Sequence, residues 1–400
     1  MADFYPEARK RFPALQSTDQ VFLDNAGGSQ TLDTVIDSIR DYLCHQNVQL
    51  GATYAAGRRA TATHARALAD AAAFLQGATD DEVVFGASAT QLLRTLSWTL
   101  RFRPGDEVVV SAIDHEANVA PWVDLAERQG LELRWWRPRD ALDPELHALD
   151  LAPLLTPRTR LVCCTHASNV LGTVTDVRAV ADLAHGVGAL LCVDGVTFAP
   201  HRLVDVRALG VDFYVFSWYK VYGPHLATLY ASWAAQTRMR SLGHLFNAHT
   251  TLADKMGLAA GSYELCHGVS AVVSYLGGRE YGSWSAMEEH EEALTETLLA
   301  YLRQVPGITI YGKRVMQESR LPIVSFTVDG WSSQELVEAI EARSNYGLRW
   351  GAFYSNRLVR ETLMLKKDGV VRVSLAHYNT MEEVLGLIKV LKEVLSLSSE

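Results

Sequence analysis

Residues 189–194 read Ala-Leu-Leu-Cys-Val-Asp, and residues 211–225 read Val-Asp-Phe-Tyr-Val-Phe-Ser-Trp-Tyr-Lys-Val-Tyr-Gly-Pro-His. Each contains a short apolar run that ends at a polar residue, Asp194 in the first and Ser217 in the second, which predicts a buried strand. Similar runs alternate with amphipathic stretches such as Val177–His185 between about Asp81 and Ala231. This alternation predicts an α/β domain around a mostly parallel sheet. The expected strands are Glu82–Phe85, Glu107–Ser111, Glu132–Trp136, Leu161–Thr165, Ala189–Asp194, Val211–Phe216 and Ala227–Ala231.

The pattern changes after Ser285, which predicts a smaller α+β domain of two or three strands packed by helices. Ser332 with Glu335, and Thr380 with Glu383, have the spacing of helix capping boxes. The expected elements here are a helix at Met287–Gln304 and strands at Ile308–Tyr311, Ile323–Val328 and Val370–Leu375. We therefore divide the chain into an N-terminal segment (1–20), a large domain (21–265) and a small C-terminal domain (266–400).

Composition excludes several classes of protein. The chain has 400 residues, 48% of them hydrophobic, and a net charge of −9, so it offers no basic field for nucleic acid or anionic lipid. The charged segment Met1–Phe12 lacks the apolar core of a signal peptide, and no run approaches the roughly 18 apolar residues of a spanning helix. We expect a cytoplasmic protein without nucleic-acid or membrane partners. The five cysteines are odd in number and show no metal-binding spacing, so no metal site is expected.

Ligands of such sheets bind at the carboxyl ends of the strands, so the residues that follow each strand are the candidates for chemistry. The first turn, residues 86–91, is Gly-Ala-Ser-Ala-Thr-Gln before a helix, which suits either a phosphate or an ordinary strand-to-helix turn. The turns at 114–118 (Asp-His-Glu-Ala-Asn) and 166–172 (His-Ala-Ser-Asn-Val-Leu-Gly) are polar and could also be capping loops.

Two further turns carry charge. Asp194 ends a buried strand, where a carboxylate can balance a cationic ring nitrogen or cap a helix. Lys220 lies between aromatic residues and before a Gly-Pro turn, and partial burial there would lower its pKa and favour a Schiff base. The alternative is a lysine whose stem packs on the surface. Together the five turns supply the groups that bind pyridoxal phosphate.

In the order of these motifs the chain resembles the class V, fold-type I pyridoxal-phosphate enzymes, which include cysteine desulfurases, kynureninases and isopenicillin-N-epimerase-like proteins. The resemblance extends from Phe-Leu-Asp-Asn-Ala-Gly-Gly at 22–28 to Arg-Val-Ser-Leu-Ala-His-Tyr-Asn-Thr at 372–380. It implies a large domain with a mostly parallel seven-stranded sheet, a small C-terminal domain, pyridoxal 5'-phosphate as cofactor, and a homodimer with shared active sites.

The resemblance also implies roles for single residues. Lys220 matches the lysine that carries the cofactor, Asp194 the carboxylate at the ring nitrogen, and His115 the imidazole stacked on the ring. Asn169 matches a side chain near the phenolic oxygen, and Arg372 the arginine that pairs with the substrate carboxylate. The matches to phosphate-binding positions are Ala89, Thr90 and Ser217, with Ser262 reaching the phosphate of the partner subunit.

Three positions depart from the desulfurases. Thr197 stands where they usually have Gln, and Tyr219 where they have His before the lysine. Their mobile loop has an Arg-x-Gly-x-x-Cys pattern, but residues 349–354 read Arg-Trp-Gly-Ala-Phe-Tyr, so Tyr354 replaces the thiol that accepts sulfur. Thr197 and Tyr219 are candidate cofactor contacts. The candidate substrate contacts beside Arg372 are Asn25, Gly27, Arg349 and Tyr354.

Retention of Arg372 predicts a substrate with an α-carboxylate. We expect C–S bond cleavage, or a related decarboxylation or deamination, on a cysteine or an S-cysteine conjugate. Tyr219 and the Tyr354 loop look more like the epimerase-like branch, some of whose members tailor antibiotics, and epimerisation is the alternative. Aminotransfer and desulfuration rank lower. A non-catalytic binding subunit is opposed by the presence of Lys220, and a metal enzyme by the adjacency of His115 and Glu116, which lacks helical ligand spacing.

Overall fold

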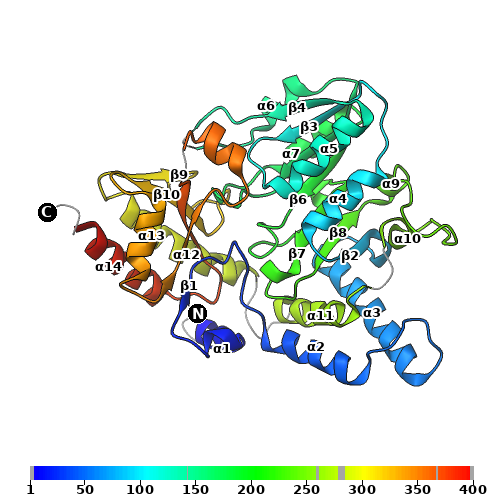
Figure 1. The fold of residues 1–400 in the computed structure, drawn as a ribbon, viewed down its shortest axis with the longest axis horizontal. Helices are drawn as coiled ribbons and strands as arrows, with labels where there is room; N and C mark the ends of the chain where they lie inside the picture. The colour runs from blue at the N-terminus through cyan, green and yellow to red at the C-terminus, as the bar shows by residue number, and fades with distance from the viewer. Residues whose placement is uncertain (1–3, 142, 258–260, 278–283, 366–367, 397–400) are drawn as a thin grey trace.

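A computed structural model describes residues 4–141, 143–257, 261–277, 284–365 and 368–396. Its larger part is built on a seven-stranded sheet in the order β2-β8-β7-β6-β5-β3-β4, and its smaller part on a four-stranded sheet (Figure 1). The strands of the large sheet are β2 (Val83–Gly86), β3 (Glu107–Ser111), β4 (Glu132–Trp136), β5 (Thr159–Thr165), β6 (Leu190–Asp194), β7 (Phe213–Ser217) and β8 (Ala227–Ala231). Strand β8 runs opposite to the other six strands of this sheet and so pairs antiparallel with β2 and β7. The predicted mostly parallel sheet is therefore confirmed.

Helices cover both faces of the large sheet because its strands are apolar on both sides. In β3, Val109 faces one hydrophobic core and Val108 and Val110 face the other, as the two-residue period of a strand requires. Helices α4 (Ala89–Thr99) and α5 (Ala120–Gln129) pack on one face, and α3 (Ala55–Phe74) and α7 (Val177–Gly186) on the other. The other helices before the small sheet are α1 (Phe4–Lys10), α2 (Asp33–His45), α6 (Ala148–Leu151), α8 (Val206–Leu209), α9 (Trp233–Gln236), α10 (Leu252–Met256) and α11 (Tyr263–Gly277).

The expected strands agree with the structure to within two residues at each end. The sixth expected strand, Val211–Phe216, shows why strand ends are hard to place, since the corresponding strand β7 begins at Phe213. Residue Asp212 instead uses its carboxylate to accept the Leu191 N–H at 2.8 Å and a hydrogen bond with His185 at 2.9 Å. Through its side chain, Asp212 is thus hydrogen-bonded to strand β6 one residue before the backbone pairing of β7 begins.

The small part is an antiparallel sheet in the order β12-β13-β10-β9, packed by three helices. Its elements are α12 (Trp284–Leu302), β9 (Ile308–Tyr311), β10 (Ile323–Val328), α13 (Ser333–Glu341), β12 (Arg349–Gly351), β13 (Val370–Ser374) and α14 (Met381–Ser396). The expectation of two or three strands misses β12, which is three residues long and mostly exposed, too short for a periodic signal. Both predicted capping boxes are confirmed by their reciprocal hydrogen bonds.

The N-terminal segment joins the two parts. Strand β1 (Val21–Phe22) pairs in parallel with β11 (Tyr346–Gly347), and Asp24 bridges to Ser374 at the end of β13. Residues 21–24, assigned to the large domain from the sequence, thus pair with the small one, and the domain boundaries stay a prediction. No helix within the described ranges is long and apolar enough to cross a membrane.

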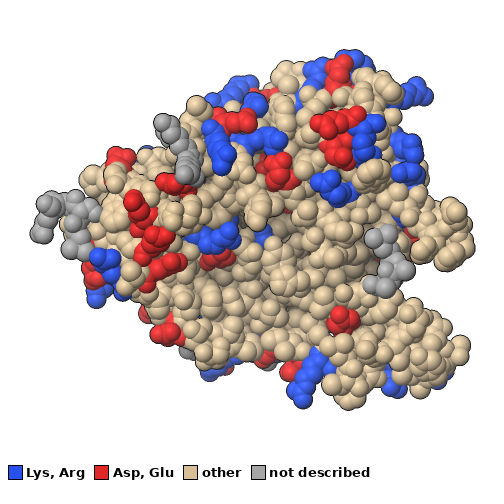
Figure 2. Space-filling model, in the orientation of Figure 1, with Lys and Arg blue, Asp and Glu red and all other residues tan. Residues whose placement is uncertain are grey.

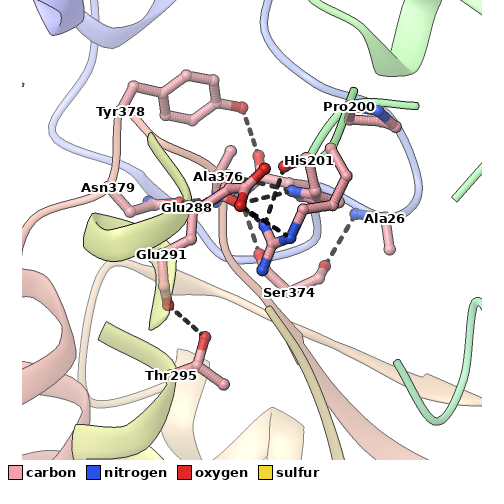
Figure 3. Close-up of polar contacts among 12 residues, drawn as sticks. Ala26, Pro200, His201, Glu288, Glu291, Thr295, Ser374, Ala376, Tyr378 and Asn379 are labelled. Atoms are coloured by element: carbon pink, nitrogen blue, oxygen red, sulfur yellow. Dashed lines mark hydrogen bonds and ion pairs between the residues drawn. The ribbon is translucent and has the colours of Figure 1, made fainter. Parts of the chain in front are cut away.

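A buried polar network fixes this junction (Figure 3). Asn25 donates its amide hydrogens to the Ser374 carbonyl at 2.9 Å and to Asn379 Oδ1 at 3.0 Å, and its oxygen accepts the Tyr378 hydroxyl. Beside it, His201 Nδ1 lies 3.0 Å from Glu291 Oε1, and both side chains are buried. The segment around Asn25 is therefore held in one position against β13.

Candidate active site

The turns that follow five strands of the large sheet meet around one cavity, as expected for the carboxyl ends of parallel strands. They are the turns after β2, β3, β5, β6 and β7. The cavity is lined by Ser88, Ala89, Thr90, His115, Ala117, Thr165, Asn169, Asp194, Val196, Thr197, Ser217, Tyr219 and Lys220. The predicted cofactor contacts that line this cavity are thus brought together, although they span more than a hundred residues of sequence.

Lys220 ends a single 3-10 turn, Trp218–Lys220, directly after β7. Its side chain is buried, and burial together with the positive charge of Arg372 lowers its pKa to about 8, against the opposing effect of Asp194. A lysine with this pKa exists partly as the neutral amine near neutral pH. The amine is the form that attacks a carbonyl carbon, as the sequence predicted for this position.

Asp194 is the last residue of β6 and is also buried. Burial raises the pKa of its carboxyl group, while the hydrogen bond from the Val196 N–H at 2.9 Å and the charge of Lys220 lower it. This short bond turns the chain sharply after the strand and aims the carboxylate into the cavity, with Thr197 on the same turn. A buried carboxylate of this kind is suited to pair with a cationic ring nitrogen.

His115 precedes a short 3-10 turn and accepts the Ala117 N–H at its Nδ1 atom, at 3.0 Å. Burial, and after it the positive charges of Lys220 and Arg372, lower the pKa of His115 to about 4. The imidazole is therefore neutral at physiological pH. Because Nδ1 accepts a hydrogen bond, the proton of the neutral ring sits on Nε2.

The turn after β2 has the properties of an anion site. Ser88 caps α4 by accepting the Gln91 N–H at 3.1 Å, and Ala89 and Thr90 are the first two residues of this 11-residue helix. Their backbone N–H groups have no partner within the helix and carry its positive end. With Ser217 across the same cavity, they supply the donors that a phosphate group requires. Phosphate donors, an amine, a carboxylate and a flat imidazole in one cavity are the set that pyridoxal phosphate requires.

Arg372 on β13 is fully buried beside this cavity. Its Nη1 donates to the Asn169 carbonyl at 3.0 Å, its Nη2 to Asp24 Oδ1 at 2.5 Å, and its Cζ lies 3.8 Å from the centre of the Phe353 ring. Its Nε atom has no hydrogen-bond partner among the described residues. A buried donor without a partner is energetically costly. The predicted contact between Arg372 and a substrate carboxylate stays a prediction.

Sequence reasoning missed Asp24, which pairs with both Arg372 and Arg349. Its signal was its place in the motif at 22–28, where it was quoted but given no role. Gly27 is required here, because a Cβ atom at that position would lie 2.7 Å from Asp24 Oδ2. Arg349 and Gly27 line a cavity next to the one at Lys220.

Three predicted contacts lie elsewhere or are occupied. Asn25 lines the cavity at Arg349, but both ends of its amide are hydrogen-bonded to Ser374 and Tyr378, and its contact with a substrate stays a prediction. Asn169 lines the main cavity, but its amide is hydrogen-bonded to the loop after β12. Ser262 is exposed just before α11, outside the cavity, and its predicted contact belongs to a partner subunit.

The fold and this constellation define a fold-type I pyridoxal-phosphate enzyme. The family model for aminotransferase class V matches residues 21–387, and the chain belongs to that family. The cofactor is therefore pyridoxal 5'-phosphate, as the motifs predicted.

Three known proteins show the branch. The chain is 49% identical to the aminotransferase-like protein FGM3 of Gibberella zeae, over 97% of both chains. It is 38% identical to the cysteine desulfurase-like protein ustD of Aspergillus flavus, over 97% of this chain and 90% of that one. The crystal structure of the cysteine desulfurase CsdA of Escherichia coli matches 98% of both chains with a TM-score of 0.85 and 27% identity. The predicted cysteine desulfurase-like branch is confirmed.

Proposed function

We propose that this enzyme cleaves the C–S bond of an S-substituted cysteine by β-elimination, releasing a thiol, pyruvate and ammonia. One observation carries the proposal: Tyr354 occupies the loop position at which desulfurases have a cysteine, 5.3 Å from the His115 ring. Of the five cysteines, Cys44 is exposed on α2, and the others are buried in strands β5 and β6 or in α11. Because none of these cysteines is placed to accept sulfur from the substrate, the sulfur atom of the substrate leaves together with its substituent, as a thiol.

The side chains have complementary tasks in this reaction. When bound, pyridoxal phosphate supplies the electron sink that stabilises negative charge at the substrate Cα. Arg372 binds the α-carboxylate, and this pairing disfavours loss of carbon dioxide relative to chemistry at Cβ. Lys220 Nζ removes the Cα proton, the Cβ–S bond breaks with its electron pair on sulfur, and the lysine ammonium then protonates the thiolate. Hydrolysis of the remaining unsaturated amine gives pyruvate and ammonia.

His115 assists through the proton on Nε2. Its pKa of about 4 keeps the imidazole neutral, so it donates a hydrogen bond to a departing sulfur atom without becoming protonated itself. Because a thiolate is a good leaving group, no stronger acid is needed. The alternative reaction, epimerisation of an amino acid, is favoured by a separate feature. The Tyr354 phenol beside His115 offers a second proton donor besides Lys220.

We also propose that the protein acts as a homodimer. Helices α2, α3 and α11 lie together along one edge of the molecule, and the space-filling view shows few charged side chains there (Figures 1 and 2). Exposed apolar residues on this edge include Ile36, Leu43 and Tyr54. Exposed apolar side chains of this size are common at subunit interfaces. The cytoplasmic location and a role in tailoring antibiotics stay predictions from the sequence.

The test is to incubate the purified holoenzyme with S-methylcysteine and with L-cysteine, measuring thiol, sulfide and pyruvate together with the configuration of the recovered amino acid. Equal amounts of thiol and pyruvate from S-methylcysteine support β-elimination. Racemised amino acid without pyruvate would replace the proposal with the epimerase. The Lys220→Ala variant serves as the control, since either reaction requires the amine.

A further inference from the structure

The loop Gly351–Ser355, which follows β12, has a strained backbone. Phe353 has a φ of +50° and Tyr354 a φ of +59°, two neighbouring bulky residues in the left-handed region. This conformation is energetically unfavourable for a bulky side chain. Glycine or asparagine would avoid much of this cost, so the surroundings must hold these two side chains in place.

The surroundings that hold the loop belong to the active site. Asn169 donates its amide hydrogen to the Phe353 carbonyl and accepts the Ser355 hydroxyl, both at 2.9 Å. The Glu116 N–H donates to the Tyr354 carbonyl at 2.8 Å. The Phe353 ring lies against the guanidinium group of Arg372. The loop is thus fastened to the turns after β3 and β5 and to β13, which all carry active-site residues.

This fastening places the Tyr354 ring at the edge of the site. The ring lies 5.3 Å from the His115 ring, tilted by 38°, and 68% of the residue is exposed. Tyr219 lies on the wall of the same cavity, where the centre of its ring is 5.8 Å from Lys220 Nζ and 5.1 Å from the His225 ring on which it stacks. Burial in a core cannot explain why a strained backbone keeps an exposed aromatic ring here.

We propose that Tyr354 and Tyr219 form an aromatic rim that binds the side-chain substituent of the substrate, and that this substituent is bulky and aromatic or apolar. Arg372 and Lys220 fix the carboxylate and the Cα atom, so the part of the substrate beyond Cβ is left to meet the rim. Aromatic rings offer it a large and rigid apolar surface at little entropic cost. The identity of the substrate as an S-substituted cysteine rests on the proposed function.

The test compares S-benzylcysteine with S-methylcysteine on the holoenzyme and on two variants. Tyr354→Asn removes the ring and keeps a residue that tolerates positive φ, whereas Tyr354→Phe keeps the ring. Dissociation constants come from the change in cofactor absorbance on binding, which requires no turnover. We expect Tyr354→Asn to weaken S-benzylcysteine about fivefold or more and S-methylcysteine less than about twofold, with Tyr354→Phe close to the parent protein.

Equal weakening of both ligands in Tyr354→Asn would overturn the inference, because the ring would then act through His115 or the loop. Unchanged binding of S-benzylcysteine in Tyr354→Asn would overturn it as well, as would a parent protein that binds S-methylcysteine more tightly. Selective binding without thiol release would leave the rim supported and refute the proposed C–S cleavage, so the two failures are distinguishable.

Discussion

The ion pair between Asp24 and Arg372 allows a quantitative prediction. Replacing Asp24 by alanine leaves a guanidinium group, whose side chain is 2% exposed, with the Asn169 carbonyl and the Phe353 ring as its neighbours. Breaking a buried pair from one side costs about 3–5 kcal/mol. Because the Asp24 side chain is 26% exposed, the lower end applies, and we expect Asp24→Ala to destabilise the fold by about 3 kcal/mol.

Arg349 provides the matched control, since it pairs with the same carboxylate at 3.3 Å from an exposed position. Arg349→Ala should cost no more than about 1 kcal/mol. Urea unfolding of the holoenzymes, at fixed protein and cofactor concentrations, measures both differences from the midpoints and slopes. If Asp24→Ala costs as little as Arg349→Ala, the buried pair does not stabilise the fold and our reasoning about Arg372 fails.

The other predictions concern the cofactor site and the sheet beneath it. The rate at which apoenzyme regains the visible absorbance of bound pyridoxal phosphate should rise with pH through about 8, because the lowered pKa of Lys220 makes its neutral amine available there; a flat profile would contradict this. Asp194→Asn should retain the fold by circular dichroism but lower turnover on the order of 100-fold, since an amide cannot balance a cationic ring nitrogen. Gly195→Ala should lower the thermal midpoint, because its Cβ would lie 2.1 Å from the Tyr214 hydroxyl; Gly186→Ala, which meets nothing within 4 Å, is the control.

Local patterns were sufficient to predict the large sheet and the cofactor cavity. The apolar run at Leu190–Asp194 is short and buried on both faces, and the polar residue that ends it enters the cavity. The same reasoning placed Lys220, His115 and Thr90 at the carboxyl edge, because parallel strands present their ends on one side. Their place at this edge follows from the strand pattern, whereas the roles assigned to them come from the family resemblance and stay predictions.

The substrate side of the site could not be predicted in this way. Asp24 forms an ion pair with Arg372, which is 348 residues away in the sequence, and no periodicity or spacing in the sequence predicts such a pair. The bonds between Asn169 and the loop at Phe353 depend on two positive φ angles, which the residue types disfavour. Such contacts are set by tertiary packing that overrides local preference.

The pairing of β1 with β11 has a consequence for the order in which the molecule is assembled. Val21 and Phe22 leave the ribosome before Tyr346 and Gly347, and they can pair only after these partners have been made. Until then strand β1 is unpaired, and Asp24 cannot form its ion pairs with Arg349 and Arg372. Contacts between residues so far apart in the sequence slow folding, and partly folded, aggregation-prone intermediates are then exposed for longer. A chain truncated before residue 346 should therefore accumulate as aggregate, even though every strand of its cofactor-binding sheet has already been synthesised.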